Sequence, residues 1–104
     1  MKITKDTKQK ISTELLKMFK TDQKIRQPNS KYIKELDVEN EKKLKKMISK
    51  FGWINKEQFG ERSETYAGVI AQHSDYNTKF QENCLKLMFF LVHNFFISLQ
   101  YNYE

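Results

Sequence analysis

Apolar residues recur at helical spacing in several stretches of the chain. In the first stretch, Ile11, Leu15, Met18 and Phe19 follow the i, i+4, i+7, i+8 pattern of one helix face. Similar stripes occur in three later stretches, and a short segment between the second and third has the length of one helical turn. The predicted helical segments are 6–25, 37–51, 55–59, 61–72 and 76–99.

Residues typical of helix ends support these boundaries. Pro28 ends the first helix, because proline disfavours the helical conformation in the residue before it. Asp37 is expected to be the N-cap of the second helix, and Asp75 offers an N-cap for the last one. Gly52 is expected just after the second helix, and Asn55 has capping-box spacing to Gln58.

The small number of turn residues favours an all-helical fold. The chain of 104 residues contains three Gly and one Pro, too few for the regular turns of a β-sandwich or barrel. Short connections favour helices that alternate in direction. We therefore expect one all-α domain over residues 1–104, a four-helix up-down bundle with a short extra helical turn between its second and third helices. Residues 1–8 are expected to fray, and residues 100–104 to form a disordered tail.

The last predicted helix is apolar nearly all round from Leu85 to Leu99. Lys86, His93 and Asn94 interrupt this run, which is also shorter than the roughly 20 apolar residues of a membrane span. A membrane partner is therefore not expected. Such a helix must be covered, either inside the bundle, by another subunit as in a homo-oligomer, or by a further segment.

Each apolar stripe turns polar at one end only. If the helices alternate in direction, these polar ends meet at one mouth of the bundle, where inward-facing polar side chains need mutual hydrogen bonds. The residues expected there are Asp22, Gln23, Arg26, Asp37, Asn40, Gln72, His73, Asp75 and Gln81.

Chemistry at this mouth would centre on His73, because imidazole gains and loses protons near neutral pH. Asp22 or Asp75 would orient His73 and complete a catalytic group, and Arg26 would hold an anionic group through its planar guanidinium. The remaining residues, which would contribute hydrogen bonds to a ligand, are Gln23, Asp37, Asn40, Gln72 and Gln81.

Each of these residues also has a purely structural interpretation. Asp37 and Asp75 are plausible helix caps, and Asp22 with Arg26 has the i, i+4 spacing of an ion pair on a helix. A lone histidine at a helix end is often a hydrogen-bonded structural residue. Both interpretations stay open on the sequence alone.

The sequence requires no cofactor and contains no metal-binding motif. It lacks His-Glu-x-x-His, Glu-x-x-His and paired cysteines, so no metal ligand is assigned. A divalent ion held by His73 with Asp22, Asp37 and Asp75 remains an open alternative. Soaking with zinc or manganese would test it.

Charge and cysteine content limit the classes of partner. The net charge is +6, and residues 1–62 contain 17 Lys and Arg against 9 Asp and Glu, a balance of +8. Most of these are lysines on helix surfaces, so nucleic-acid binding is not favoured. Cys84, the single cysteine, lies in an apolar stretch and is expected in the core. The N-terminus lacks the apolar region of a signal peptide, which favours a cytoplasmic location.

Short motifs in the chain resemble an uncharacterised bacterial domain-of-unknown-function family. They are Asp-Gln-x-x-Arg at 22–26, Gly52-Trp53 with the later Gly60, and Gln-His-x-Asp at 72–75 followed by Gln81. The chain departs from the family pattern at Ile54 and Ser74, and family members continue beyond the last helix with further motifs. The resemblance implies the location of a site and no known activity.

Two functions from different classes are compatible with these observations. The first is small-molecule binding or hydrolytic general acid/base chemistry at the polar mouth, centred on His73, with a small polar or anionic ligand. No nucleophile motif accompanies it, so an enzymatic activity is not established. The second is a protein-interaction module of immunity or regulatory type, which would use the basic first helices and the apolar last helix.

Overall fold

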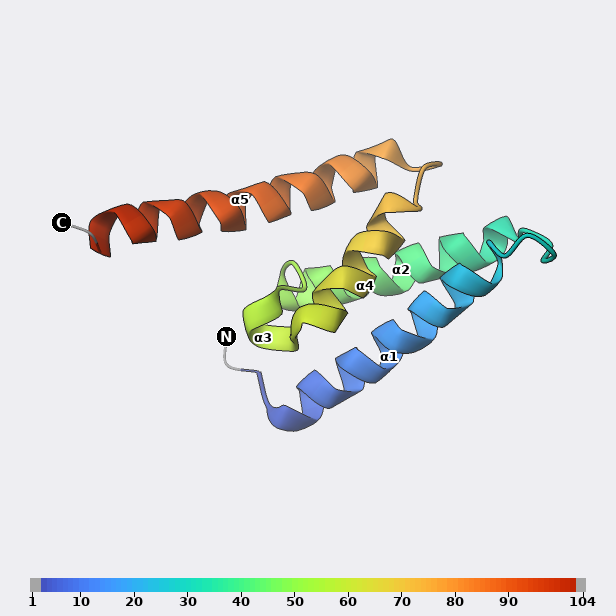
Figure 1. Ribbon diagram of the computed structural model, residues 1–104, viewed down its shortest axis with the longest axis horizontal. Helices are drawn as coiled ribbons and strands as arrows, with labels where there is room; N and C mark the ends of the chain where they lie inside the picture. The colour runs from blue at the N-terminus through green and yellow to red at the C-terminus, as the bar shows by residue number, and fades with distance from the viewer. Residues whose placement is uncertain (1–2, 103–104) are drawn as a thin grey trace.

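The computed structural model describes residues 3–102, with side chains described for residues 3–90. Within this range every regular element is a helix, as Figure 1 shows. The helices are α1 (Lys5–Lys24), α2 (Lys34–Phe51), α3 (Lys56–Phe59), α4 (Glu61–Gln72) and α5 (Thr78–Asn102). The all-α prediction is confirmed.

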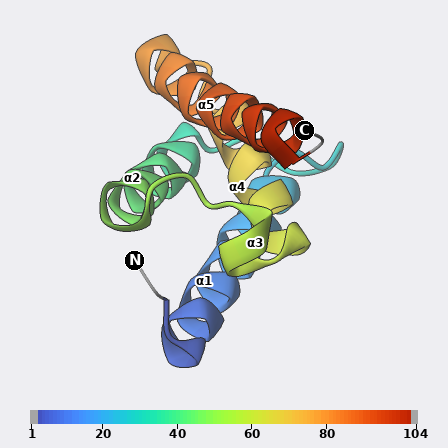
Figure 2. The ribbon, with the colours of Figure 1, turned by 90° about the vertical axis from the view of Figure 1, so that its left-hand side faces the viewer.

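Helix α4 is the central element of the fold. It packs against α1, α2, α3 and α5, and the view along the molecule in Figure 2 places it between α5 and α1. Its buried positions are mostly small: Ser63, Ala67 and Ala71 lie beside Ile70. Small side chains let neighbouring helices approach closely, which explains why α4 buries these residues more fully than it buries the larger Tyr66 and Val69.

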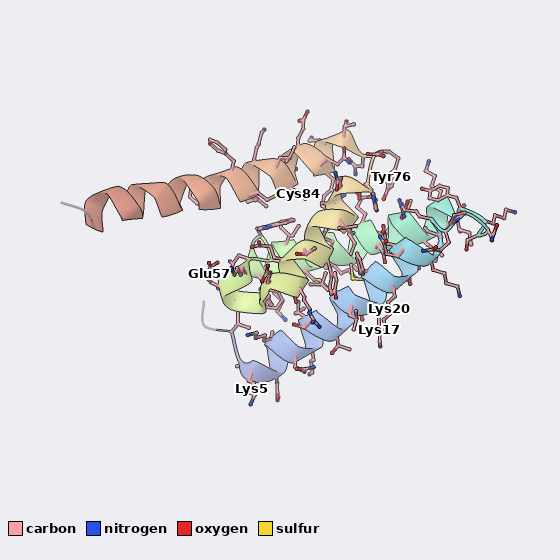
Figure 3. All side chains as sticks on the ribbon, viewed as in Figure 1. Lys5, Lys17, Lys20, Glu57, Tyr76 and Cys84 are labelled. Atoms are coloured by element: carbon pink, nitrogen blue, oxygen red, sulfur yellow. The ribbon has the colours of Figure 1, made fainter. Side chains whose placement is uncertain are left out.

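The core lies where α1, α2, α3 and α4 meet. Leu15 and Met18 come from α1, and Leu44 and Met47 from α2, as their helical spacing predicts. The other core residues come from the connection after α2, from α3, from α4 and from the first turns of α5. They are Trp53, Ile54, Phe59, Ala67, Ile70, Ala71, Phe80 and Cys84. The prediction of a buried Cys84 is confirmed, and its side chain faces α4 in Figure 3.

Several predicted helix boundaries are confirmed. Helix α4 has the predicted limits, and Gly52 follows α2 with φ +78°. Asn55 caps α3, because its Oδ1 accepts a hydrogen bond of 2.8 Å from the Gln58 backbone N–H. Helix α1 begins earlier than predicted, because Thr4 caps it and Lys5 is already helical.

Two predicted N-caps are wrong. Helix α2 begins at Lys34 after the extended Ile33, so Asp37 lies inside its first turn, where its carboxylate is held by other side chains. Helix α5 begins at Thr78, and Asn77 occupies the capping position: its Oδ1 accepts from the Phe80 N–H at 3.1 Å. The Asp75 carboxylate accepts from Gln81 Nε2 instead.

The four-helix up-down bundle is not confirmed. The long helices do alternate in direction along the chain, as Figure 1 shows. Helix α5, however, packs mainly on α4, with a cation–π contact of 5.5 Å between Lys45 Nζ of α2 and the Phe80 ring, and it extends along the long axis of a molecule measuring 55 × 31 × 23 Å. It continues through Asn102, where a tail from residue 100 was expected, and residues 103–104 lie outside the described range.

None of the helices within the described residues combines the length and apolarity needed to cross a membrane. This finding agrees with the expectation from Lys86 that the apolar run of α5 is no membrane span.

Candidate functional site

The carboxylate of Asp22 is the centre of a polar cluster at the end of α1. Its side chain is 1% exposed, yet three polar side chains reach it. Gln23 Nε2 lies 2.9 Å from Oδ2, while Arg26 Nη1 at 3.0 Å and His73 Nδ1 at 2.7 Å both contact Oδ1. A buried carboxylate is stable only with such partners, so these contacts account for its place in the interior.

His73 sits directly after α4, where the chain leaves the helix. Its side chain is 30% exposed, unlike the Asp22 carboxylate behind it. A carboxylate only accepts hydrogen bonds, so the geometry assigns a proton to Nδ1. Among the described side chains none is hydrogen-bonded to Nε2, which leaves this nitrogen available to a ligand or to water.

Arg26 connects the ends of α1 and α2. Its Nη1 and Nη2 donate to the two carboxylate oxygens of Asp37 at 3.0 and 2.7 Å, a bidentate arrangement. Nη1 also contacts the Asp22 carboxylate and the Asp22 backbone oxygen. The hydrogen bond with Asp37 raises the pKa of Arg26 further. The guanidinium is thus engaged by two carboxylates of the protein itself.

Asp37 is held from two sides. Besides Arg26, the hydroxyl of Tyr32 donates to Asp37 Oδ2 at 2.5 Å. Burial of Asp37 favours a raised pKa, but the hydrogen bonds from Arg26 and Tyr32 outweigh it, so the pKa of Asp37 is lowered. The same hydrogen bond raises the pKa of Tyr32. Tyr32 also places its ring 5.6 Å from the Arg26 guanidinium carbon, a cation–π contact.

A second buried carboxylate, Glu41, lies one turn further along α2. It is 4% exposed and accepts from Tyr76 Oη and Asn77 Nδ2, both at 2.5 Å, with Lys45 Nζ at 3.3 Å. The Tyr76 hydroxyl also lies 3.2 Å from the Asp37 backbone oxygen. Burial and the hydrogen bond with Glu41 raise the pKa of Tyr76. Figure 3 shows Tyr76 at the turn between α4 and α5, where these contacts fasten the turn to α2.

The structure brings five of the nine predicted residues into one cluster: Asp22, Gln23, Arg26, Asp37 and His73. We call this group the Asp22 cluster. The remaining four have other contacts. Asn40 donates to the Met18 backbone oxygen at 3.0 Å and so joins α2 to α1.

Gln72, Asp75 and Gln81 form a local connection of their own around the α4–α5 turn. Gln81 Nε2 donates to the Gln72 backbone oxygen at 2.8 Å and to Asp75 Oδ1 at 3.0 Å. Asp22, and not Asp75, is therefore the carboxylate in contact with His73. Gln72 contributes its main chain to this connection, and its side chain is exposed.

Sequence reasoning missed Tyr32, Glu41 and Tyr76 as members of the polar network. A signal for Glu41 was present, because it lies four residues after Asp37 and three before the buried Leu44, on the same helix face. Tyr32 and Tyr76 lie in connections between helices, where periodicity carries no information on side-chain direction.

No three His, Cys, Asp or Glu side chains among the described residues are grouped so as to hold a metal ion. The Asp22 and Asp37 carboxylates do lie near each other, but the Arg26 guanidinium contacts both. A guanidinium already supplies the positive charge that would otherwise be provided by an ion between two carboxylates.

The Asp22 cluster has the parts of a general base. A buried carboxylate fixes the imidazole in one orientation and one tautomer, and the outer nitrogen is left to accept a proton. Arg26 is not similarly available, because both of its terminal nitrogens already donate to carboxylates. Anion binding by Arg26 would require those contacts to be exchanged.

Comparisons of the chain with protein-family models, with curated proteins and with solved structures found no match. The resemblance of the Asp-Gln-x-x-Arg and Gln-His-x-Asp motifs to a bacterial family therefore stays a prediction, and the site is interpreted from its own geometry.

Proposed function

We propose that the Asp22 cluster is a small-molecule site in which His73 acts as a general base. The observation that carries the proposal is the pairing of His73 Nδ1 with Asp22 Oδ1 at 2.7 Å, with the carboxylate buried and the imidazole partly exposed. This pairing leaves Nε2 to take a proton from a hydroxyl group or from water. The reaction would be a hydrolysis or another proton-abstracting step.

The other members of the cluster would act as positioning residues. Gln23 donates to the second oxygen of Asp22, which fixes the plane of the carboxylate. Arg26 holds Asp22 and Asp37 together and so anchors the end of α1 to α2. Because Arg26 is already paired with carboxylates, a neutral polar ligand fits the site better than an anion does.

Hydrolysis of an activated ester, p-nitrophenyl acetate, tests for a reactive imidazole nitrogen, acting as base or as nucleophile, without knowledge of the natural ligand. His73→Gln is the informative variant, since a glutamine amide can still donate to Asp22 while it offers no basic nitrogen. We expect the variant to lose about a hundredfold in rate, the lower end of the contribution of a general base. The matched control is His93→Gln, which changes the other histidine of the chain.

Asp22→Asn separates general base catalysis from mere presence of an imidazole. It replaces a carboxylate, which only accepts hydrogen bonds, by an amide whose NH2 can donate to Nδ1 and so favour the other tautomer, and we expect a rate between those of the wild type and His73→Gln. Circular dichroism would verify that each variant is folded. Equal rates for the wild type and a folded His73→Gln variant would show that the cluster is structural.

A further inference from the structure

Helix α5 presents apolar side chains to solvent on the side that faces away from α4. Leu85, Phe89 and Phe90 are 63%, 70% and 61% exposed, and with Lys86 they line an open hollow of about 440 Å³. The opposite side of the same turns is buried, with Phe80 and Cys84 packed in the core. We call the exposed residues Leu85, Phe89 and Phe90 the α5 surface.

We propose that the α5 surface is a self-association site, which pairs with the α5 surface of a second copy of this chain. The charge of the chain and the exposed apolar area of α5 both favour a second copy as the occupant. The inference goes beyond the proposed function, because the α5 surface shares no residue with the Asp22 cluster.

Charge is the first argument. Each copy has a net charge of +6, and residues 1–62 alone contribute +8, with 17 Lys and Arg against 9 Asp and Glu. Two copies therefore repel each other wherever α1 or α2 would meet. Between Lys86 and Glu104 the sequence contains no Asp, Glu, Lys or Arg. Helix α5 lies on the opposite side of the molecule from α1, as Figures 1 and 2 show, so two copies that meet at α5 keep their α1 lysines apart, and Lys86 is the cation that lines the hollow between them.

An acidic partner would be attracted elsewhere. Negative charge is complementary to the lysines of α1, and Lys17 and Lys20 point away from the body of the molecule in Figure 3. An apolar surface is instead complementary to the α5 surface, and a second α5 surface has this character. A two-fold axis would bring identical surfaces together, which is the common geometry of homodimers.

Area is the second argument. With about 200 Å² for each large side chain, the three residues of the α5 surface leave roughly 400 Å² of apolar area in water. Two copies would together bury about 800 Å², around half of a standard interface of about 1,600 Å². The sequence from Leu91 to Leu99 continues mostly apolar.

Sedimentation velocity of the full chain at increasing concentration tests the proposal. We expect a dimer in the wild type, and at least about tenfold weaker association in Leu85→Glu and in Phe90→Glu, because a charge in an apolar interface must be desolvated. Ser49→Glu on α2 is the control, since it makes the same change in charge at an exposed position outside α5. We expect it to dimerise like the wild type.

Salt dependence and lipid binding distinguish the other occupants. Pairing through α5 should be unchanged or strengthened by added salt, because salt screens the repulsion between the two basic copies. A wild-type chain that stays monomeric, or a dimer that persists in both α5 variants, overturns the proposal. Binding of the monomer to phosphatidylcholine vesicles, lost in Phe90→Glu, would also overturn it and would identify a lipid surface as the occupant.

Discussion

Arg26 and Asp37 form a bidentate ion pair that closes the connection between α1 and α2. The two hydrogen bonds, of 3.0 and 2.7 Å, join Arg26, two residues after the end of α1, to Asp37 in the first turn of α2, and Pro28 lies between them. Because Nη1 of the same guanidinium also contacts Asp22, the pair fixes the position of the carboxylate that holds His73. The geometry of the His73–Asp22 pair thus depends on the contact between Arg26 and Asp37, although neither His73 nor Asp22 takes part in that contact.

Loss of Arg26 should therefore destabilise the fold. Arg26→Gln leaves two buried carboxylates without their cation, and we expect it to lower the free energy of unfolding by about 2–4 kcal/mol. Arg26→Lys should cost less, about 1–2 kcal/mol, because it keeps the charge but cannot form the bidentate pair. Urea denaturation measures both. The control Arg62→Gln, at an exposed position, should change the free energy of unfolding by less than about 0.5 kcal/mol. A change as small as this on Arg26→Gln would contradict the bridging role of Arg26.

The contribution of Tyr32 should depend on pH. The pKa of Asp37 is lowered below its ordinary 3.8, so its ionised form stabilises the fold above about pH 4, and this stabilisation is lost as the pH falls through the lowered pKa. Tyr32→Phe removes one of the hydrogen bonds to the ionised form. We expect a cost of about 1 kcal/mol at pH 7 that shrinks below pH 4. Tyr66→Phe is the control, and its effect should not vary over this pH range.

The helices could be predicted from the sequence because each buries a stripe with regular spacing. Leu15 with Met18, and Leu44 with Met47, are core residues in the structure as their spacing indicates. The same rule, extended by one or two turns, placed Asp22 beside His73, residues that are 51 positions apart. This worked because α1 and α4 pack against each other and run in the same direction, so that His73, directly after α4, meets Asp22 near the end of α1.

Contacts made by residues in or next to the connections between helices could not be predicted from helical spacing. The start of α2 was placed three residues late, because Asp37 has the composition of a cap but is paired with Arg26 and Tyr32. The direction of Tyr32 and Tyr76 follows from the path of the chain between helices, which has no repeating pattern. The position of α5 was also beyond sequence reasoning, since an apolar helix can be covered from several sides.

Glu41 should anchor the start of α5. Its carboxylate accepts from Tyr76 and from Asn77, and Asn77 in turn caps α5 through the Phe80 amide. We expect Glu41→Ala to lower stability by about 2 kcal/mol, because it leaves polar groups without partners. Faster hydrogen exchange at the Phe80 amide would show that the cap is loosened. Glu39→Ala, an exposed position, should leave that amide unchanged.

The Cys84 thiol should be inert in the folded protein and should oppose folding at high pH. Burial raises its pKa to about 11, from an ordinary value of 9.0. The folded state therefore prefers the thiol, and stability falls as the pH rises from about 9 through 11. We expect a steeper loss in the wild type than in Cys84→Ala, where only other groups such as Tyr76 titrate. Reaction with a thiol reagent should require unfolding, and rapid labelling of the native protein would contradict the buried position.

Two glycines should respond to alanine with opposite signs. Gly52 has φ +78°, a conformation that alanine rarely adopts, so Gly52→Ala should lower the free energy of unfolding by about 1–2 kcal/mol although no atom lies within 4 Å of the added Cβ. Gly68 lies inside α4 with equally open space and helical backbone. Gly68→Ala should raise stability by about 0.5–1 kcal/mol, because alanine has the higher helix propensity. Thermal unfolding of both variants measures the contrast, and a loss of stability on Gly68→Ala would mean that α4 is packed too tightly there for a methyl group.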